Sequence, residues 1–245
     1  MNGRIFEDMD AQSNHQQWYE LRTWHFSNDN QQGLTESYLQ QAYLPALNRA
    51  GLDPIGVFSE TQAQGTARLF LLIPYPDLAV FAGMDAKLAA DTVYTAAAEP
   101  YLNAPATGPA YERIESFLLH AFRHMPTIEV PEKKQRLFEL RCYESPSESA
   151  GQKKIAMFND AGEIDIFKRI GARPVFFGET MIGERRPNLI YMLCFDNMDD
   201  HDARWKAFGS DAGWQRLKAM DEYSDARLIT RITRTFLSPT GYSQI

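Results

Sequence analysis

Cysteine, positive net charge and long apolar runs are all scarce in this chain of 245 residues. The two cysteines, Cys142 and Cys194, each fall in a stretch that we expect to be a strand, where a thiol behaves as a small buried hydrophobe. The net charge of −7 argues against a protein that binds the phosphate backbone of nucleic acids, because such proteins need a basic surface. We therefore expect inert thiols and no nucleic-acid partner.

Apolar segments long enough to cross a membrane are also missing. No segment approaches the roughly eighteen uninterrupted apolar residues of a membrane-spanning helix. Residues 1–17 are polar and acidic and lack the apolar core of a secretion signal, so we expect a flexible N-terminal arm. These absences predict a cytoplasmic protein with no membrane partner.

Several signatures of catalytic sites are missing as well. The sequence contains no glycine-rich phosphate loop, no nucleophile elbow and no zinc-type spacing of cysteine and histidine. We therefore predict no resident nucleotide, flavin or zinc cofactor, with haem kept as a lesser alternative. His120 and His124 are spaced like two metal ligands on one helix, but they fall where a strand leads into a linker. We predict no metal there.

A short motif that occurs twice organises the rest of the chain. Residues 18–24, WYELRTW, are repeated as FELRCY at residues 138–143, so that the two glutamates lie 119 positions apart (139 − 20). Apolar and polar side chains alternate in both copies, as they do in β-strands. Because successive side chains of a strand point to opposite faces, each copy places an acid, a base and an aromatic on one face, namely Glu20, Arg22 and Trp24, and Glu139, Arg141 and Tyr143.

The repeat extends well beyond this motif. Three pairs of landmarks are each 120 positions apart, namely Gly51 and Gly171, Pro54 and Pro174, and Leu69 and Leu189. A fixed offset over separate landmarks indicates an internal repeat. Prolines and charged residues at 126–136 are typical of a linker. We therefore divide the chain into an arm at 1–17, a first module at 18–125, the linker at 126–136 and a second module at 137–245.

Hydrophobic patterns and turn residues predict the order strand, helix, strand, strand, helix, strand in each module. The first module should have strands at 18–24, 55–60, 68–73 and 113–122, a loop at 28–33, a helix at 36–49 capped by Thr35, and a helix at 77–100 interrupted near Gly83. The second should have strands at 137–143, 174–180, 189–195 and 227–236, and helices at 152–170, interrupted near Gly162, and 199–220. This βαββαβ order is that of a ferredoxin-like module.

Several stretches of the second module resemble the NIPSNAP family. They are KIAMFN at 154–159, EIDIF at 163–167, PVFFGE at 174–179, PNLIYML at 187–193 and the helix pattern Trp205-x-x-Phe208-x-x-Asp211-x-x-Trp214. The first module carries the similar stretches YELRT at 19–23 and LPALNRAG at 44–51 but lacks the Trp/Phe/Trp helix. The resemblance implies an α+β fold in which two tandem ferredoxin-like modules form a pseudo-dimeric α/β barrel within one chain.

Such a pairing is physically reasonable. The helices of a βαββαβ module cover one face of its sheet, and the bare face must be buried against another surface. A second copy of that face is self-complementary about a two-fold axis, and the two sheets then enclose a space that can hold a small ligand. We also expect two chains to associate as a homodimer, because the outer strands and helices leave surfaces to cover.

We expect the ionic face of each repeated strand to look into this barrel. Tyr19, Leu21, Phe138 and Leu140 would then pack under the helices, together with His25 as a satisfied histidine. The ionic side chains permit two interpretations. Each glutamate pairs with its arginine and locks the two sheets together, or they form a pocket with the catalytic residues Glu20, Glu139, Arg22 and Arg141 and the substrate-binding residues Trp24, Tyr143, Glu60 and Glu179.

The sequence therefore supports two hypotheses of function. In the first, the protein binds a small aromatic or acidic organic molecule in a barrel pocket, and a cofactor-independent oxygenase or an isomerase is the kind of enzyme that this pocket would suit. In the second, it is a non-catalytic scaffold that binds a partner protein. Barrels of this architecture host unrelated chemistries, so the fold alone does not decide between them.

Overall fold

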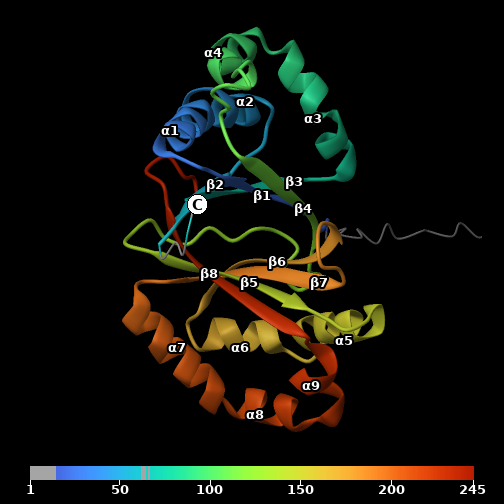
Figure 1. Cartoon of the computed structure of the whole chain (residues 1–245). Coiled ribbons are helices and arrows are strands. Elements are labelled where there is room, and N and C mark those ends of the chain that lie inside the picture. The colour runs from blue at the N-terminus through green and yellow to red at the C-terminus, as the bar shows by residue number, and fades with distance from the viewer. Residues whose placement is uncertain (1–14, 62–64, 66) are drawn as a thin grey trace, which may run out of the picture.

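The structure is a computed structural model that describes residues 15–61, 65 and 67–245 (Figure 1). Most of the predicted arm at 1–17 lies outside the described residues. The first module contains β1 (Trp18–His25), α1 (Asp29–Tyr38), the π-helical turn η1 (Leu39–Tyr43), α2 (Leu44–Arg49), β2 (Gly56–Glu60), β3 (Arg68–Tyr75), α3 (Leu78–Ala90), α4 (Thr92–Leu102) and β4 (Arg113–Ala121). The second contains β5 (Leu137–Glu144), α5 (Glu148–Asn159), α6 (Glu163–Arg169), β6 (Arg173–Ile182), β7 (Asn188–Phe195), α7 (Met198–Ser210), α8 (Ala212–Ala219), the 3-10 turn η2 (Asp221–Tyr223), α9 (Asp225–Leu228) and β8 (Arg231–Pro239).

The strands form one closed antiparallel barrel in the order β1-β3-β2-β8-β5-β7-β6-β4. Within each module the order is that of a ferredoxin-like sheet, and the pairs β2–β8 and β4–β6 join the two sheets edge to edge. Helices α1 to α4 cover the barrel on one side and α5 to α9 on the other (Figure 1). The predicted pseudo-dimeric α/β barrel of two tandem modules is confirmed.

Three apolar cores hold this arrangement together. Two of them lie between a sheet and its helices, and the third, the interior core, fills the barrel with side chains from strands of both modules. Each fully buried leucine or phenylalanine contributes roughly 1.5–3 kcal/mol relative to an exposed one. The large members of the interior core are Tyr19, Leu21, Phe58, Phe70, Leu72, Leu119, Phe138, Leu140, Phe176, Ile190, Met192, Leu237 and Ile245.

The segments that follow β4 and β8 each lie on the other module. The Glu129 amide donates to the Val175 carbonyl at 2.9 Å, and the Gln244 amide donates to the Ile55 carbonyl at 2.9 Å. Ile128 packs against the interior core and Ile245 belongs to it. We call residues 122–131 and 240–245 the exchanged segments. They tie the two modules together, whereas the exact domain boundaries stay a prediction.

Two predictions about the first helices were wrong in detail. The predicted loop at 28–33 is helical, because the Asn28 side chain accepts a hydrogen bond from the Gln31 amide at 3.1 Å and caps α1. Thr35 is not a cap; its buried hydroxyl donates to the Ala110 carbonyl at 2.9 Å. The start of the helix was misplaced because Asn and Thr both cap helices well.

The long second helix of each module is interrupted at an aspartate. In the first module the break lies at Asp91 and not at Gly83 as predicted, because the Asp91 side chain accepts from the Val93 and Tyr94 amides at 3.0 Å and starts α4. Asp211 does the same for α8. Part of the predicted last strand is also helical, since α9 precedes β8. Among the described residues, no helix is both long and apolar enough to cross a membrane.

Candidate functional site

The repeated strands have the predicted alternation but the opposite orientation. Leu21 and Leu140 point into the barrel and belong to the interior core, whereas Trp24 packs in the core between sheet and helices. The prediction that the ionic face looks into the barrel was therefore wrong. The aromatic rings of the other face, such as Phe138 against Phe58 with centroids 4.9 Å apart, fill the interior better than ions would.

In the first module, Glu20 and Arg22 form an ion pair beneath the helices. The Arg22 Nε donates to Glu20 Oε1 at 2.8 Å, and the Tyr75 hydroxyl donates to Glu20 Oε2 at 3.2 Å. The guanidinium lies 5.5 Å from the ring centroids of Trp24 and Tyr43. Each charge is thus satisfied by neighbours on the strands and helices of its own module.

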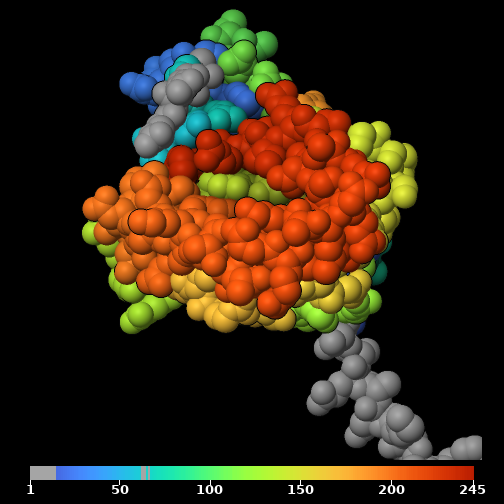
Figure 2. All heavy atoms as spheres, turned by 90° about the horizontal axis from the view of Figure 1, so that it is seen from below, coloured from blue at the N-terminus to red at the C-terminus, as the bar shows by residue number. Residues whose placement is uncertain are grey.

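Glu139 and Arg141 form the matching pair in the second module. Arg141 donates to Glu139 Oε1 through both Nε and a terminal nitrogen at 2.8 Å, and the Trp205 indole of α7 donates to Glu139 Oε2 at 2.9 Å. The guanidinium stacks 3.7 Å from the Trp205 ring centroid and also donates to the Tyr143 hydroxyl at 3.2 Å. Seen from below, a hollow opens between α7 and the C-terminal residues (Figure 2), yet Glu139 is 0% exposed.

The structure therefore separates the predicted site residues. Glu20, Arg22 and Trp24 lie together in one module, and Glu139, Arg141 and Tyr143 lie together in the other, on opposite sides of the barrel. Each glutamate pairs with its arginine as one interpretation predicted, but each pair lies within its own module and does not lock the two sheets together. The catalytic and substrate-binding assignments of these six residues stay predictions.

The two other predicted residues lie on the second strand of each module, Glu60 at the end of β2 and Glu179 within β6. Glu60 holds Arg68 through two hydrogen bonds of 2.8 and 2.9 Å. Glu179 accepts from the Gln152 side chain at 2.7 Å and lines an outer groove with His120. The described residues contain no group of three or more His, Cys, Asp or Glu side chains placed to hold a metal ion.

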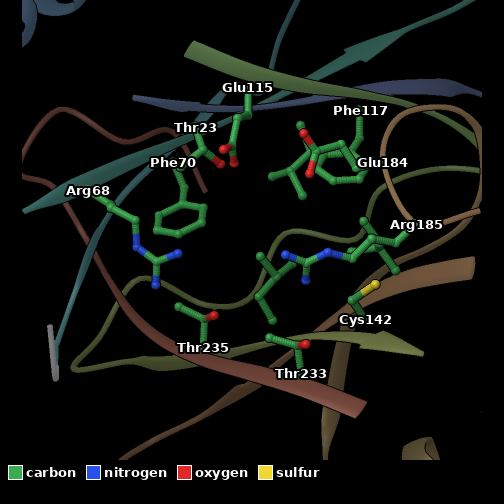
Figure 3. A pocket seen from close by; sticks show the side chains of 13 residues that line it. Thr23, Arg68, Phe70, Glu115, Phe117, Cys142, Glu184, Arg185, Thr233 and Thr235 are labelled. Carbon is green, nitrogen blue, oxygen red and sulfur yellow. The ribbon is translucent and has the colours of Figure 1, made fainter. Parts of the chain in front are cut away.

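A cavity of about 150 Å³ opens at one mouth of the barrel (Figure 3). We call it the barrel-mouth cavity. Its apolar part consists of Leu21, Phe70, Phe117, Leu140 and Ile190, and its polar part of Thr23, Arg68, Glu115, Cys142, Glu184, Arg185, Thr233 and Thr235. A cavity of this size holds a molecule about as large as benzene, and groups extending from it reach the polar rim.

Two arginines extend toward each other across this cavity (Figure 3). Arg68 comes from β3 and is fixed by Glu60. Arg185 comes from the turn between β6 and β7, where its backbone has φ 58°, a left-handed conformation that is uncommon for residues other than glycine. Its side chain is 53% exposed, with the Glu144 carboxylate 3.6 Å from its guanidinium. Arg185 is therefore the more available of the two for an anionic ligand.

Glu115 faces the same space from β4 (Figure 3). It contacts His25 Nε2 at 3.2 Å and accepts from Arg113 Nε at 2.8 Å. Its partial burial would raise the pKa of this carboxyl, but the hydrogen bonds and charges of His25 and Arg113 outweigh burial and lower it. Glu115 is thus ionised at neutral pH. His25 is the satisfied histidine that was predicted, but on the interior side.

The remaining polar groups in the interior of the cavity are a thiol and hydroxyls. Burial raises the pKa of the Cys142 thiol to about 12, so the thiol keeps its proton. Thr233 lies opposite Cys142 in the ladder between β8 and β5, just as Glu115 lies opposite Thr23 between β4 and β1. The Thr233 hydroxyl is buried and has no hydrogen-bond partner among the described residues. A ligand would supply the partner that this hydroxyl lacks.

Sequence reasoning missed these cavity residues. Arg68 begins a continuously apolar strand and Arg185 lies in a turn, so neither belonged to a recognisable motif. Glu115 left one usable signal, because it shares a strand face with the aromatic Phe117 on a strand whose partner carries Thr23. Using this signal would have required knowledge that β4 lies beside β1 in the sheet.

Comparison with known proteins supports the fold and matches the second half of the chain to a family. Residues 138–244 match the family model named NIPSNAP. The second half of the chain is a NIPSNAP domain. The resemblance predicted from the sequence is thereby confirmed, and the NIPSNAP domain carries Glu139, Arg141 and the Trp205 helix. No curated protein matches the chain significantly.

Solved structures resemble the whole chain and not only its NIPSNAP domain. A provisionally named monooxygenase from Lactobacillus acidophilus aligns with a TM-score of 0.61 and 7% identity, over 91% of this chain and 94% of that one. A provisionally named monooxygenase from Fusobacterium nucleatum aligns with a TM-score of 0.59 and 8% identity, over 91% and 92%. An anthrone oxidase-like protein aligns with a TM-score of 0.53 and 8% identity, over 91% of each chain. At such identities these likenesses show the shared fold alone.

Proposed function

We propose that the protein binds a small organic molecule with an aromatic body and an acidic group in the barrel-mouth cavity. The observation that carries this proposal is the pairing of an apolar floor with two arginines that face each other above it. The ring would rest among Leu21, Leu140 and Ile190. A carboxylate or phenolate at its edge would accept hydrogen bonds from the Arg185 fork.

Chemistry on this ligand would proceed as in a cofactor-independent oxygenase or an isomerase. Both reactions begin when a proton leaves the ligand, and both need the resulting anion to be stabilised. The names of the barrels with the same fold, monooxygenase and anthrone oxidase-like, favour an organic substrate that is oxidised. The cavity supplies an ionised carboxylate and two guanidinium groups for these two tasks.

Binding of benzoate tests the proposal directly. Benzoate has a ring that matches the cavity and a carboxylate for Arg185. We expect saturable binding by ligand-observed NMR, and we expect Arg185→Ala to weaken it roughly tenfold or more, because a hydrogen bond to a charged group contributes about 1.5–3 kcal/mol. Toluene, which lacks the acidic group, should bind more weakly than benzoate and should not respond to the substitution.

Arg186→Ala is the matched control. Arg186 is the next residue of the same turn, is exposed and does not line the cavity. It should leave benzoate binding unchanged. Equal losses in the two variants would mean that only the overall charge of the turn matters, and an absence of binding to the wild-type protein would favour the non-catalytic scaffold instead.

A further inference from the structure

Glu115 combines three properties that a proton acceptor in the barrel-mouth cavity needs. It lines the cavity, it is ionised at neutral pH, and it is held in place from behind by His25 and Arg113. A carboxylate offers about four lone-pair directions, and these two partners use only part of them. The Glu115 carboxylate can therefore meet a ligand while it stays oriented.

The other candidates in the cavity meet fewer of these conditions. The Cys142 thiol keeps its proton, since burial raises its pKa. Glu184 lies exposed in the turn after β6. Glu20 and Glu139 lie on the faces of the sheets that the helices cover, and they do not line the cavity. Glu115 is also the carboxylate that faces both arginines from across the cavity (Figure 3).

The geometry points to Glu115 as the residue that takes a proton from a carbon or oxygen acid bound in the barrel-mouth cavity, with His25 as its positioning residue. This inference rests on the proposed function. The bond from the ligand atom to hydrogen breaks, the proton goes to a Glu115 oxygen, and the electron pair stays on the ligand. The resulting anion lies between Arg68 and Arg185, which stabilise it. An isomerase would return the proton to a second atom of the same ligand, so that no other reactant is needed.

The hydrogen bonds that orient Glu115 also limit its basicity. A carboxylate with a lowered pKa is a weak base, so the rate depends on how strongly the arginines stabilise the anion as it forms. This condition favours ligands whose proton is already acidic, such as a carbon next to a carbonyl group or to an aromatic ring.

The probe 5-nitro-1,2-benzisoxazole tests this role without knowledge of the natural ligand. A base removes the proton on C3, the C–H electron pair completes the nitrile, and the N–O bond breaks with its electrons on oxygen. The product phenolate is measured by its absorbance. We expect the wild-type protein to accelerate the reaction and Glu115→Gln to lose about 100-fold or more of that acceleration. Glu112→Gln, an exposed carboxylate next to β4, should keep the full rate.

The role of His25 has its own readout. In His25→Asn the carboxylate loses one hydrogen bond that stabilises its ionised form, so the acid limb of the rate profile should move to higher pH while KM stays the same. The charged and titratable groups around Glu115 in this measurement are His25 on β1, Arg113 on β4, Arg68 on β3, Cys142 on β5, and Glu184 and Arg185 in the turn after β6. An unchanged profile would overturn the role of His25.

Benzoate binding to the same samples separates the two proposals. If Glu115→Gln binds benzoate but the wild-type protein does not open the ring of the probe, Glu115 is not a base and the cavity remains a binding site. If neither is seen, both proposals fail. If Glu184→Gln loses the activity and Glu115→Gln keeps it, then Glu184 and not Glu115 takes the proton, and the inference is overturned. Thermal unfolding of each variant establishes that it is folded.

Discussion

At the scale of single residues, the buried ion pairs show how the barrel tolerates charged side chains that water does not reach. Glu139 is 0% exposed, and its two oxygens are taken up by Arg141 and by the Trp205 indole. The desolvation of two charges costs several kcal/mol and is offset only when the geometry satisfies both partners. Glu20 and Arg22 are less enclosed, with 22% of the Arg22 side chain exposed.

Breaking one pair should therefore cost more than breaking the other. We expect Arg141→Met to lower the free energy of unfolding by about 3–5 kcal/mol, because it removes the arginine from buried Glu139 and leaves His201 Nε2, 3.3 Å away, as the basic group beside that carboxylate. Arg22→Met should cost less, since water reaches that pair. Urea unfolding measures both. The double variant Glu139→Leu/Arg141→Met should recover most of the loss, and a single variant as stable as the wild type would contradict this account.

At the scale of helices and strands, each module repeats the same break in its second long helix. Asp91 and Asp211 each cap the following helix, and they are held by Arg49 at the end of α2 and Arg169 at the end of α6. The backbone bond from Tyr94 and the Arg49 side chain lower the pKa of Asp91, and Arg169 and the backbone amides lower that of Asp211. The motif explains why an aspartate and not a glycine marks the break.

These lowered pKa values predict a pH dependence. A carboxyl whose pKa is lower in the folded than in the unfolded chain adds stability above the unfolded value of about 4, and this stability is lost as the pH falls through the folded value. Asp91→Asn/Asp211→Asn should be less stable than the wild type at pH 7 and should approach it in acid. Thermal unfolding from pH 7 to 3 measures this, and Asp85→Asn, exposed on α3, should behave like the wild type throughout.

The order of elements followed from the sequence, but the direction of the strand faces did not. The alternation of polar and apolar residues establishes that Glu20 and Arg22 share a face, because the side-chain period of a strand is two. It does not say which face meets the helices. That depends on what the helices offer, and the Trp205 indole and the tyrosine hydroxyls that satisfy the ions come from elements far away in the chain.

The cavity was less predictable than the fold for a similar reason. Thr23 and Cys142 lie in the repeated motif, but their partners Glu115 and Thr233 come from the last strand of each module. The left-handed backbone at Arg185 also had no signal, because such positions usually carry glycine or asparagine.

At the scale of the whole molecule, the exchanged segments make one cooperative unit of two modules. Ile245 is 0% exposed among the residues of the interior core, and Ile128 packs against the same core from the other module. Unfolding of either module would therefore expose the interior of both. The association of two such chains into a homodimer stays a prediction.

Shortening a buried side chain of an exchanged segment should destabilise the entire barrel. We expect Ile245→Ala to lower the free energy of unfolding by about 2–5 kcal/mol, as for other buried isoleucines. Tryptophan fluorescence and circular dichroism should still report a single shared transition. Ile182→Ala, at a side chain that is 66% exposed, should change stability by less than about 0.5 kcal/mol. Separate transitions for the two probes would show that the modules unfold independently.

The position of the cavity has one more consequence. Thr23 and Cys142 are counterparts in the repeat and line the same mouth, so the approximate two-fold axis passes through it. In a barrel of two identical chains, a glutamate at this mouth would confront its own copy, and the two negative charges would repel each other. The duplicated chain is free of that constraint, so Glu115 faces a threonine in place of its twin. A ligand can therefore bind in a single orientation, whereas a perfectly symmetric barrel would accept two equivalent ones.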